Sequence, residues 1–222
     1  MMNKLAAVHI KCYKLIRSIY KQKSLGYPKI SIAQNMQAFV PCIPSLRNEL
    51  AVWLRHKYYN LDFIDKVRRY LDFIGVNYYS PTWVELSGWG IRNFFADNCK
   101  LNHRNLKKNS MGWDIYPQGL YDLLISLKKY NLPVFILENG ICTEDDSLRW
   151  DYIKEHLASI NRAMLKGVNI WGYIYWSLLD NFEWDKGFAP RFGLIDVDYN
   201  NYRRSVRDSA RQLAQVSRTG RM

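Results

Sequence analysis

Apolar residues follow two alternating spacings along the chain. Short runs rich in β-branched and aromatic residues are typical of buried strands, and they lie at about 29–35, 73–79, 134–138 and 169–176. Between them apolar residues recur every three or four positions, which predicts helices over about 3–22, 45–71 (in two segments), 117–130, 148–166 and 204–217. Strands that alternate with helices indicate parallel βαβ units, so the pattern predicts an α/β fold.

The remaining stretches have no such period. Pro41 and Pro44 mark a loop, and residues 81–112 predict a long polar loop, which inside a compact domain is usually functional. Residues 192–199 predict a short hairpin before the last helix.

The strand predicted at 134–138 ends on a charged side chain. Pro133 precedes it and Asn139-Gly140 closes it as a turn, so Glu138 lies at its carboxyl end. A carboxylate there is costly unless it is paired or used. In a (β/α) barrel, catalytic groups occupy this end of the strands. These residues alone are equally compatible with a surface glutamate in a turn.

Composition adds two constraints. Aromatic residues make up 15% of the chain, which suits a core and also sugar-binding clefts, because the C–H faces of a pyranose stack on aromatic rings.

The formal net charge is +12, and no Asp or Glu precedes Glu49. The early basic residues fall on the polar side of the helix predicted at 3–22, and no nucleic-acid motif accompanies them. A solvated helix face is therefore favoured over nucleic-acid binding.

The four cysteines form no CxxC motif and have no histidine partners at ligand spacing, so no metal site is predicted. The first residues do not resemble a signal peptide, and no stretch is long and apolar enough to predict a membrane span. The expectation is a cytoplasmic protein with reduced thiols and no membrane partner. The cysteines are Cys12, Cys42, Cys99 and Cys142.

Four blocks carry a more specific signal: Phe73-Ile-Gly-Val-Asn-Tyr-Tyr-Ser80, Met111-Gly-Trp-Asp-Ile-Tyr-Pro117, Ile136-Leu-Glu-Asn-Gly140, and Trp176-Ser-Leu-Leu-Asp-Asn-Phe-Glu-Trp184 followed by Arg191-Phe-Gly-Leu194. Through them the chain resembles the carboxyl-terminal half of glycoside hydrolase family 1, the retaining β-glucosidase family. The resemblance covers most of residues 62–210, and residues 1–45 match more loosely. It implies a single domain over 1–222, a partial (β/α)8 TIM barrel with roughly strands 5–8 and their helices.

The resemblance also implies catalytic residues. Glu138 matches the nucleophile, the carboxylate that attacks the anomeric carbon and forms a covalent glycosyl-enzyme. Tyr79 matches the tyrosine that donates a hydrogen bond to the nucleophile. Asn77 lies on the same strand face as Tyr79 and matches another site residue. Without the resemblance, Tyr79 would be read as one more core aromatic.

Sugar-binding roles are implied by the last block. Trp176 matches the tryptophan beneath the glycone, Glu183 and Trp184 match the pair that hydrogen-bonds the outer hydroxyls, and Phe192 matches a rim aromatic. Because Glu183 would repel a phosphate, the implied substrate is a non-phosphorylated β-glucoside or related oligosaccharide, with no cofactor. The residues expected to brace this loop are Asp180, Asn181 and Arg191.

The family's acid/base glutamate, in an Asn-Glu-Pro motif, has no counterpart here. Asn48-Glu49 is followed by Leu50 in a helical pattern, so the role is not transferred. Retaining hydrolysis needs two carboxylates about 5–5.5 Å apart, so we expect little or no activity from this chain alone. A half barrel also leaves strand edges open. A complementing N-terminal half or aggregation would account for them better than a homodimer. The alternative function is a non-catalytic sugar-binding or decayed relative.

Overall fold

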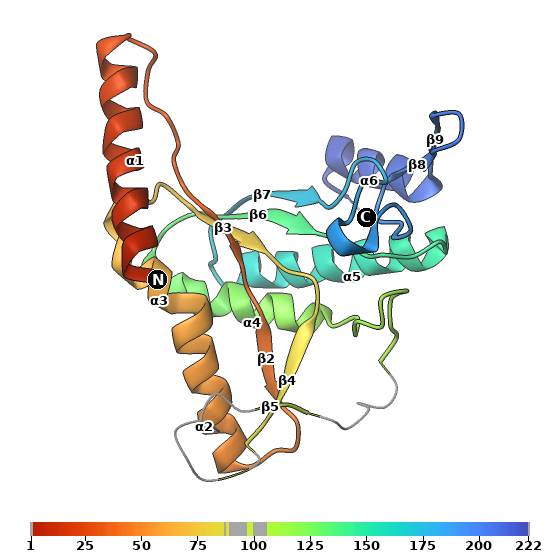
Figure 1. Ribbon diagram of the computed structural model, residues 1–222, viewed down its shortest axis with the longest axis horizontal. Helices are drawn as coiled ribbons and strands as arrows, with labels where there is room; N and C mark the ends of the chain where they lie inside the picture. The colour runs from red at the N-terminus through yellow and green to blue at the C-terminus, as the bar shows by residue number, and fades with distance from the viewer. Residues whose placement is uncertain (1, 87, 89–96, 100–105, 222) are drawn as a thin grey trace.

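A computed structural model describes residues 2–86, 88, 97–99 and 106–221 (Figure 1). Its main sheet has four parallel strands in the order β1-β3-β6-β7. The strands are β1 (Ala33–Asn35), β3 (Ile74–Asn77), β6 (Val134–Asn139) and β7 (Ile170–Tyr175). The prediction of parallel strands at these places is confirmed, although β1 is much shorter than the stretch 29–35. β1 and β7 are the outer strands of this sheet.

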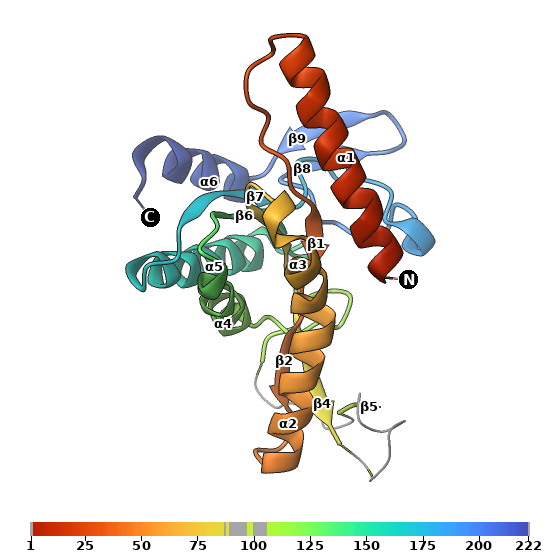
Figure 2. The ribbon, with the colours of Figure 1, turned by 90° about the vertical axis from the view of Figure 1, so that its left-hand side faces the viewer.

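The helices also lie close to where the apolar spacing predicts them. α4 and α5 pack against each other beneath β6 and β7, and α1 extends away from the body of the molecule (Figures 1 and 2). The helices are α1 (Met2–Gln22), α2 (Leu46–Arg55), the π-helical turn η1 (His56–Leu61), α3 (Asp62–Val67), η2 (Arg68–Tyr70), α4 (Pro117–Leu127), η3 (Lys128–Tyr130), α5 (Asp146–Leu165), η4 (Trp184–Lys186) and α6 (Asp208–Thr219). No helix in the described ranges is long and apolar enough to cross a membrane.

The main core joins the sheet to these helices. Val76 and Ile136 of the sheet and Leu124 and Leu127 of α4 are fully buried in one cluster. At about 25 cal/mol per Å² of apolar surface, this burial is the largest favourable contribution to folding. It fixes the strands whose carboxyl ends carry the candidate site.

A second sheet occupies residues that the sequence predicts as loops. β2 (Ala38–Pro41) pairs parallel with β4 (Pro81–Glu85), and β4 pairs antiparallel with β5 (Asp97–Asn98). The prediction of continuous loop was therefore wrong for β2 and β4. Pro41 ends β2 and Pro81 begins β4, and a missing N–H is tolerated at strand ends. Packing of Val84 in β4 against Ala51 of α2 stabilises the sheet.

A hairpin is present, but it extends beyond the predicted residues 192–199: β8 (Ile195–Asp198) lies within them, whereas its antiparallel partner β9 (Arg203–Val206) follows them. The prediction that the last helix begins near residue 204 was wrong, because 203–206 form β9 and α6 begins at Asp208. All four β9 side chains are exposed, so no apolar period marked them as a strand.

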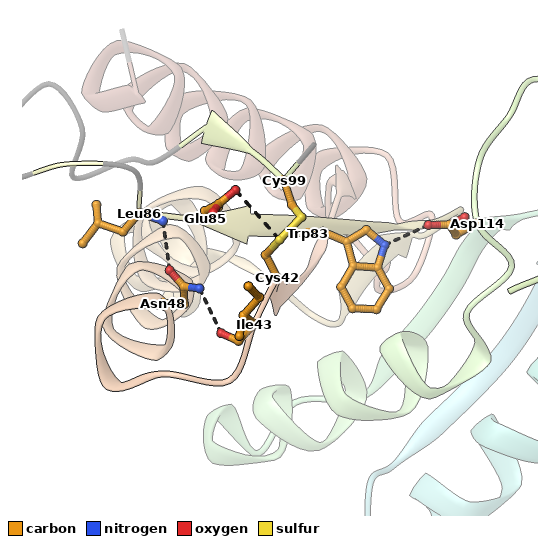
Figure 3. The surroundings of a disulfide bond; sticks show 8 residues. All are labelled: Cys42, Ile43, Asn48, Trp83, Glu85, Leu86, Cys99 and Asp114. Atoms are coloured by element: carbon orange, nitrogen blue, oxygen red, sulfur yellow. Dashed lines mark hydrogen bonds between the residues drawn. A yellow bond between two sulfur atoms is a disulfide. The ribbon is translucent and has the colours of Figure 1, made fainter. Parts of the chain in front are cut away.

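The structure joins Cys42 and Cys99 by a disulfide (Figure 3). The prediction of reduced thiols was therefore wrong for this pair, whereas Cys12 and Cys142 are free. The two cysteines are 57 residues apart in sequence. They meet because β4 lies between the strands that they follow, β2 and β5.

Candidate active site

The site lies where the parallel strands end. β3 ends at Asn77, which is paired in register with Glu138 of β6. The N–H of Tyr78 donates to the Glu138 carbonyl oxygen at 2.9 Å. The next strand, β7, is followed by Trp176, whose N–H donates to the Asn139 carbonyl at 3.0 Å. These backbone bonds hold the three strand ends side by side.

Glu138 accepts a hydrogen bond from a neighbouring phenol. The Tyr79 hydroxyl donates to Oε2 of Glu138 at 2.6 Å. Burial raises the pKa of Tyr79 far above its usual value, and the hydrogen bond to Glu138 raises it further. Tyr79 therefore keeps its proton at every physiological pH and acts as a hydrogen-bond donor to the Glu138 carboxylate.

Glu138 and Tyr79 open into a cavity of about 470 Å³. Asn77 shares this cavity, and its buried Oδ1 has no hydrogen-bond partner in the described ranges. A buried acceptor without a partner is unusual in a native protein, so Asn77 is ready to accept a bond from a bound hydroxyl. The cavity is lined by Asn35, Gln37, Asn77, Tyr79, Ser80, Trp113 and Glu138.

A second, outer cavity of about 670 Å³ contains Glu183 and the strongly exposed Trp184. Burial raises the pKa of Glu183, and the negative charge of Glu138 raises it further, so the two carboxyl groups interact electrostatically. Lysine and sulfur-containing side chains complete the wall. The lining residues are Ser110, Met111, Trp113, Cys142, Glu183, Trp184, Asp185, Lys186, Ala189 and Pro190.

Two of the residues expected at the site line neither of these cavities. Phe192 is only 2% exposed and packs edge-on against Tyr79, with ring centroids 6.3 Å apart. Trp176 is half-buried, forms a cis peptide with Ser177 and lines neither cavity. Its carbonyl oxygen approaches Gly140 so closely that a Cβ at this position would overlap it, which explains the glycine.

Sequence reasoning did not single out Trp113, although it lies in the Met111–Pro117 block. Its indole lines both cavities and contacts the rings of Tyr79 and Phe192, with centroids 6.1 and 6.2 Å away. Asn35 was also missed. It ends β1, so the reasoning that selected Glu138 at the end of β6 could have selected it too.

The loop after Trp176 is braced as expected. Asp180 is buried and bonds Arg207 at 3.0 Å, Arg191 at 3.4 Å and the Gly193 N–H at 2.7 Å. Burial alone would raise the pKa of Asp180, but the bonds from Arg207 and Gly193 outweigh burial and lower it. Asn181 donates to the Ser177 hydroxyl at 2.9 Å. These bonds position the segment that presents Glu183.

Comparisons with known proteins identify a family for the chain. The family description "Glycosyl hydrolase family 1" matches residues 8–222. A beta-galactosidase of Sulfolobus acidocaldarius is 34% identical over 233 residues, covering 95% of this chain and 46% of that protein. The structure of Fpglu1 from Fervidobacterium pennivoraus matches with a TM-score of 0.84 at 30% identity, covering 99% of this chain and 49% of that one.

A beta-glucosidase from Thermotoga maritima, solved in complex with glucoimidazole, matches with a TM-score of 0.75 at 31% identity. The match covers 86% of this chain and 51% of that one. The chain thus spans about half the length of these relatives.

Proposed function

The chain belongs to glycosyl hydrolase family 1, and from that membership we propose that residues 1–222 form one domain, the carboxyl-terminal half of a (β/α)8 barrel. The order β1-β3-β6-β7, all parallel and in chain order, supports this assignment. So does the coverage of about half of each relative. In this assignment the four strands are barrel strands 5–8.

The proposed reaction is hydrolysis of β-glycosides with retention, and Glu138 is the nucleophile. The observation that carries it is the 2.6 Å hydrogen bond from Tyr79 to Oε2 within the inner cavity. With Oε2 held by Tyr79, Oε1 is left to attack the anomeric carbon. The resulting glycosyl-enzyme is then hydrolysed by water.

The proposed substrate is a non-phosphorylated β-glycoside or related oligosaccharide. Asn77 accepts a sugar hydroxyl through its unpartnered Oδ1. Trp176 keeps the place beneath the glycone that the family resemblance implies, although it lines neither of the two cavities. Glu183 and Trp184 bind outer hydroxyls from the second cavity, with Phe192 packed behind the inner one. A carboxylate at Glu183 favours hydroxyl donors and repels phosphate.

The second carboxylate is proposed to come from a complementing amino-terminal half, in the same polypeptide or another. Within the described residues, Glu138 is the only carboxylate that lines the inner cavity. A hollow of about 710 Å³ lies between α1 and the free edge of β1, and Asn35 lines both this hollow and the inner cavity. A parallel strand added to β1 would therefore end at the rim of the inner cavity.

The position and lining of this hollow suit such a strand. A right-handed βαβ crossover through α1 requires its first strand to lie beside β1. The apolar lining of the hollow includes Leu5, Val8, Cys12, Ile32 and Phe63. An acid/base glutamate at the end of the added strand would face Glu138.

Co-expression with the amino-terminal half of a family-1 relative tests this proposal. We expect hydrolysis of an aryl β-glucoside only when both halves are present, and none with Glu138→Gln. General acid assistance is worth about 10²–10⁴-fold, so the chain alone should be weaker by at least that factor. A 2-fluoroglycoside should label Glu138 in the complemented enzyme. Robust turnover by the purified chain alone would contradict the proposal.

The alternative function is non-catalytic sugar binding. It is favoured by the single carboxylate that the described residues place in the inner cavity. Saturable binding of cellobiose or glucose to the complemented protein, with no labelling of Glu138 and no turnover, would favour this alternative. Labelling of Glu138 would exclude it.

A further inference from the structure

Two sulfur atoms and a carboxylate meet at the far end of the second sheet, away from the proposed glycosidase site. Cys42 follows β2, Glu85 ends β4 and Cys99 follows β5 (Figure 3). Their ligand atoms, two Sγ and one carboxylate oxygen, all lie within 4.8 Å of one another. Cys42 is buried, and its Sγ lies 4.0 Å from Oε2 of Glu85.

The charge of this cluster depends on the state of the sulfurs. As a disulfide they are neutral and have no proton to donate to Glu85. Reduced to thiolates, they would place two negative charges beside the carboxylate. Within the described part of the chain, no lysine, arginine or histidine forms an ion pair with Glu85. Three adjacent anions favour either protonation or a bound cation.

The backbone around the cluster is held by bonds that do not involve the disulfide. The N–H of Cys42 donates to the Val84 carbonyl and the N–H of Cys99 to the Trp83 carbonyl, both at 2.9 Å. Asn48 connects the flanking residues: its Nδ2 donates to the Ile43 carbonyl and its Oδ1 accepts from the Leu86 N–H, both at 2.9 Å (Figure 3). Reduction therefore leaves all three side chains facing one another.

We propose that the reduced form of this cluster binds a thiophilic divalent cation such as Zn²⁺, with Cys42 Sγ, Cys99 Sγ and a Glu85 oxygen as ligands and water in the fourth position. Zn²⁺ prefers tetrahedral sites with sulfur at about 2.3 Å and carboxylate oxygen at about 2.0–2.2 Å. Ligand atoms around such an ion lie about 3–4 Å apart, so small side-chain movements suffice.

A dithiol reductant converts the disulfide into the two free thiols. It supplies two electrons and two protons to the Cys42–Cys99 bond and is itself oxidised to a disulfide. Zn²⁺ then displaces the two thiol protons into solvent. The disulfide and the metal-bound form are mutually exclusive states of one site.

Titration with Co²⁺, a spectroscopic substitute for Zn²⁺, tests the site on the full chain after reduction by a dithiol and its removal without oxygen. We expect one equivalent of Co²⁺ to give a thiolate-to-cobalt charge-transfer band that Zn²⁺ displaces. The oxidised chain should give none. Cys42→Ser should remove the band or weaken binding by at least tenfold, and Glu85→Gln should weaken binding while keeping the band. Cys12→Ser and Glu49→Gln are matched controls.

A measurement on the unsubstituted chain guards against misfolded variants. Zn²⁺ should protect Cys42 and Cys99 from alkylation after reduction and leave the exposed Cys12 reactive. The proposal is wrong if the reduced chain shows no charge-transfer band, if the band is lost in Cys12→Ser, or if Zn²⁺ leaves all these thiols equally reactive.

Discussion

Among single residues, Tyr79 makes the contact that supports the proposed nucleophile most directly. Replacing it with phenylalanine removes the donor to Oε2 of Glu138 and leaves the ring contact with Trp113. Loss of one oxyanion-hole donor costs about 10²–10³-fold in kcat. Tyr79 instead positions the nucleophile, so we expect Tyr79→Phe to lower kcat of the complemented enzyme by no more than that factor.

Tyr202→Phe is the matched control, because Tyr202 is exposed on the turn between β8 and β9. We would compare kcat of the two variants by steady-state kinetics and verify their folding by circular dichroism. Equal kcat for Tyr79→Phe and the unsubstituted enzyme would show that this hydrogen bond does not serve catalysis.

How far the site could be read from sequence differs from residue to residue. Asn77 and Glu138 could be placed together, because polar residues at the carboxyl ends of parallel strands meet at one edge of the sheet. Trp113 could not, because it lies outside any strand and reaches the cavities through the path of its loop. Phe192 was predicted to line the site, but it packs behind the inner cavity. The sequence alone does not show which of these two places an aromatic side chain takes.

Among the elements, α5 and β6 are connected through buried polar groups. Asn139 donates to the Tyr78 carbonyl and to the Tyr152 hydroxyl, both at 2.8 Å, and Tyr152 stacks on His156 with centroids 3.8 Å apart. Burial lowers the pKa of His156 to about 4 from its usual 6.5. The folded chain therefore holds this ring neutral in a range where the unfolded chain protonates it.

This difference predicts a pH dependence of stability. Below about pH 6.5 the unfolded state binds a proton that the folded state does not, so the free energy of unfolding should fall as pH drops toward 4. A gap of about 2.5 between the two pKa values corresponds to at most about 3 kcal/mol. His156→Phe keeps an aromatic ring stacked on Tyr152 but cannot be protonated. In urea unfolding at pH 7 and pH 4, this variant should lack the part of the fall in unfolding free energy that His156 causes. Identical pH slopes for both proteins would contradict the assignment.

The main sheet was predictable because each of its strands is an apolar run between helices. The second sheet was not. β2 and β4 are short, contain proline at their ends and are stabilised by α2, which contributes Ala51 from another part of the chain. Contacts between segments that are distant in sequence cannot be predicted from the local pattern of residues. The disulfide between Cys42 and Cys99, which follow β2 and β5, could not be predicted for the same reason.

For the whole molecule, the open edges of the main sheet matter most. β1 and β7 each pair on one side only within the sheet as described, and Ile174 and Trp171 of β7 are exposed. Unpaired edges recruit other strands. Light scattering by the purified chain should therefore rise with concentration and fall when the amino-terminal half is added. Ile174→Lys should reduce it, whereas Leu165→Lys, at an exposed position at the end of α5, should not.

The geometry of these edges determines what kind of assembly would form. All four strands point the same way, so β7 of one copy can accept β1 of the next with its polarity preserved. Such a contact uses two different surfaces, so it forms a ring where the rotation between copies closes and an open filament where it does not. Two half barrels rotated about a shared barrel axis would close into eight strands, whereas any other rotation would leave one free β1 and one free β7 at the ends of a growing filament. A segment that covers β1 would stop growth at that end.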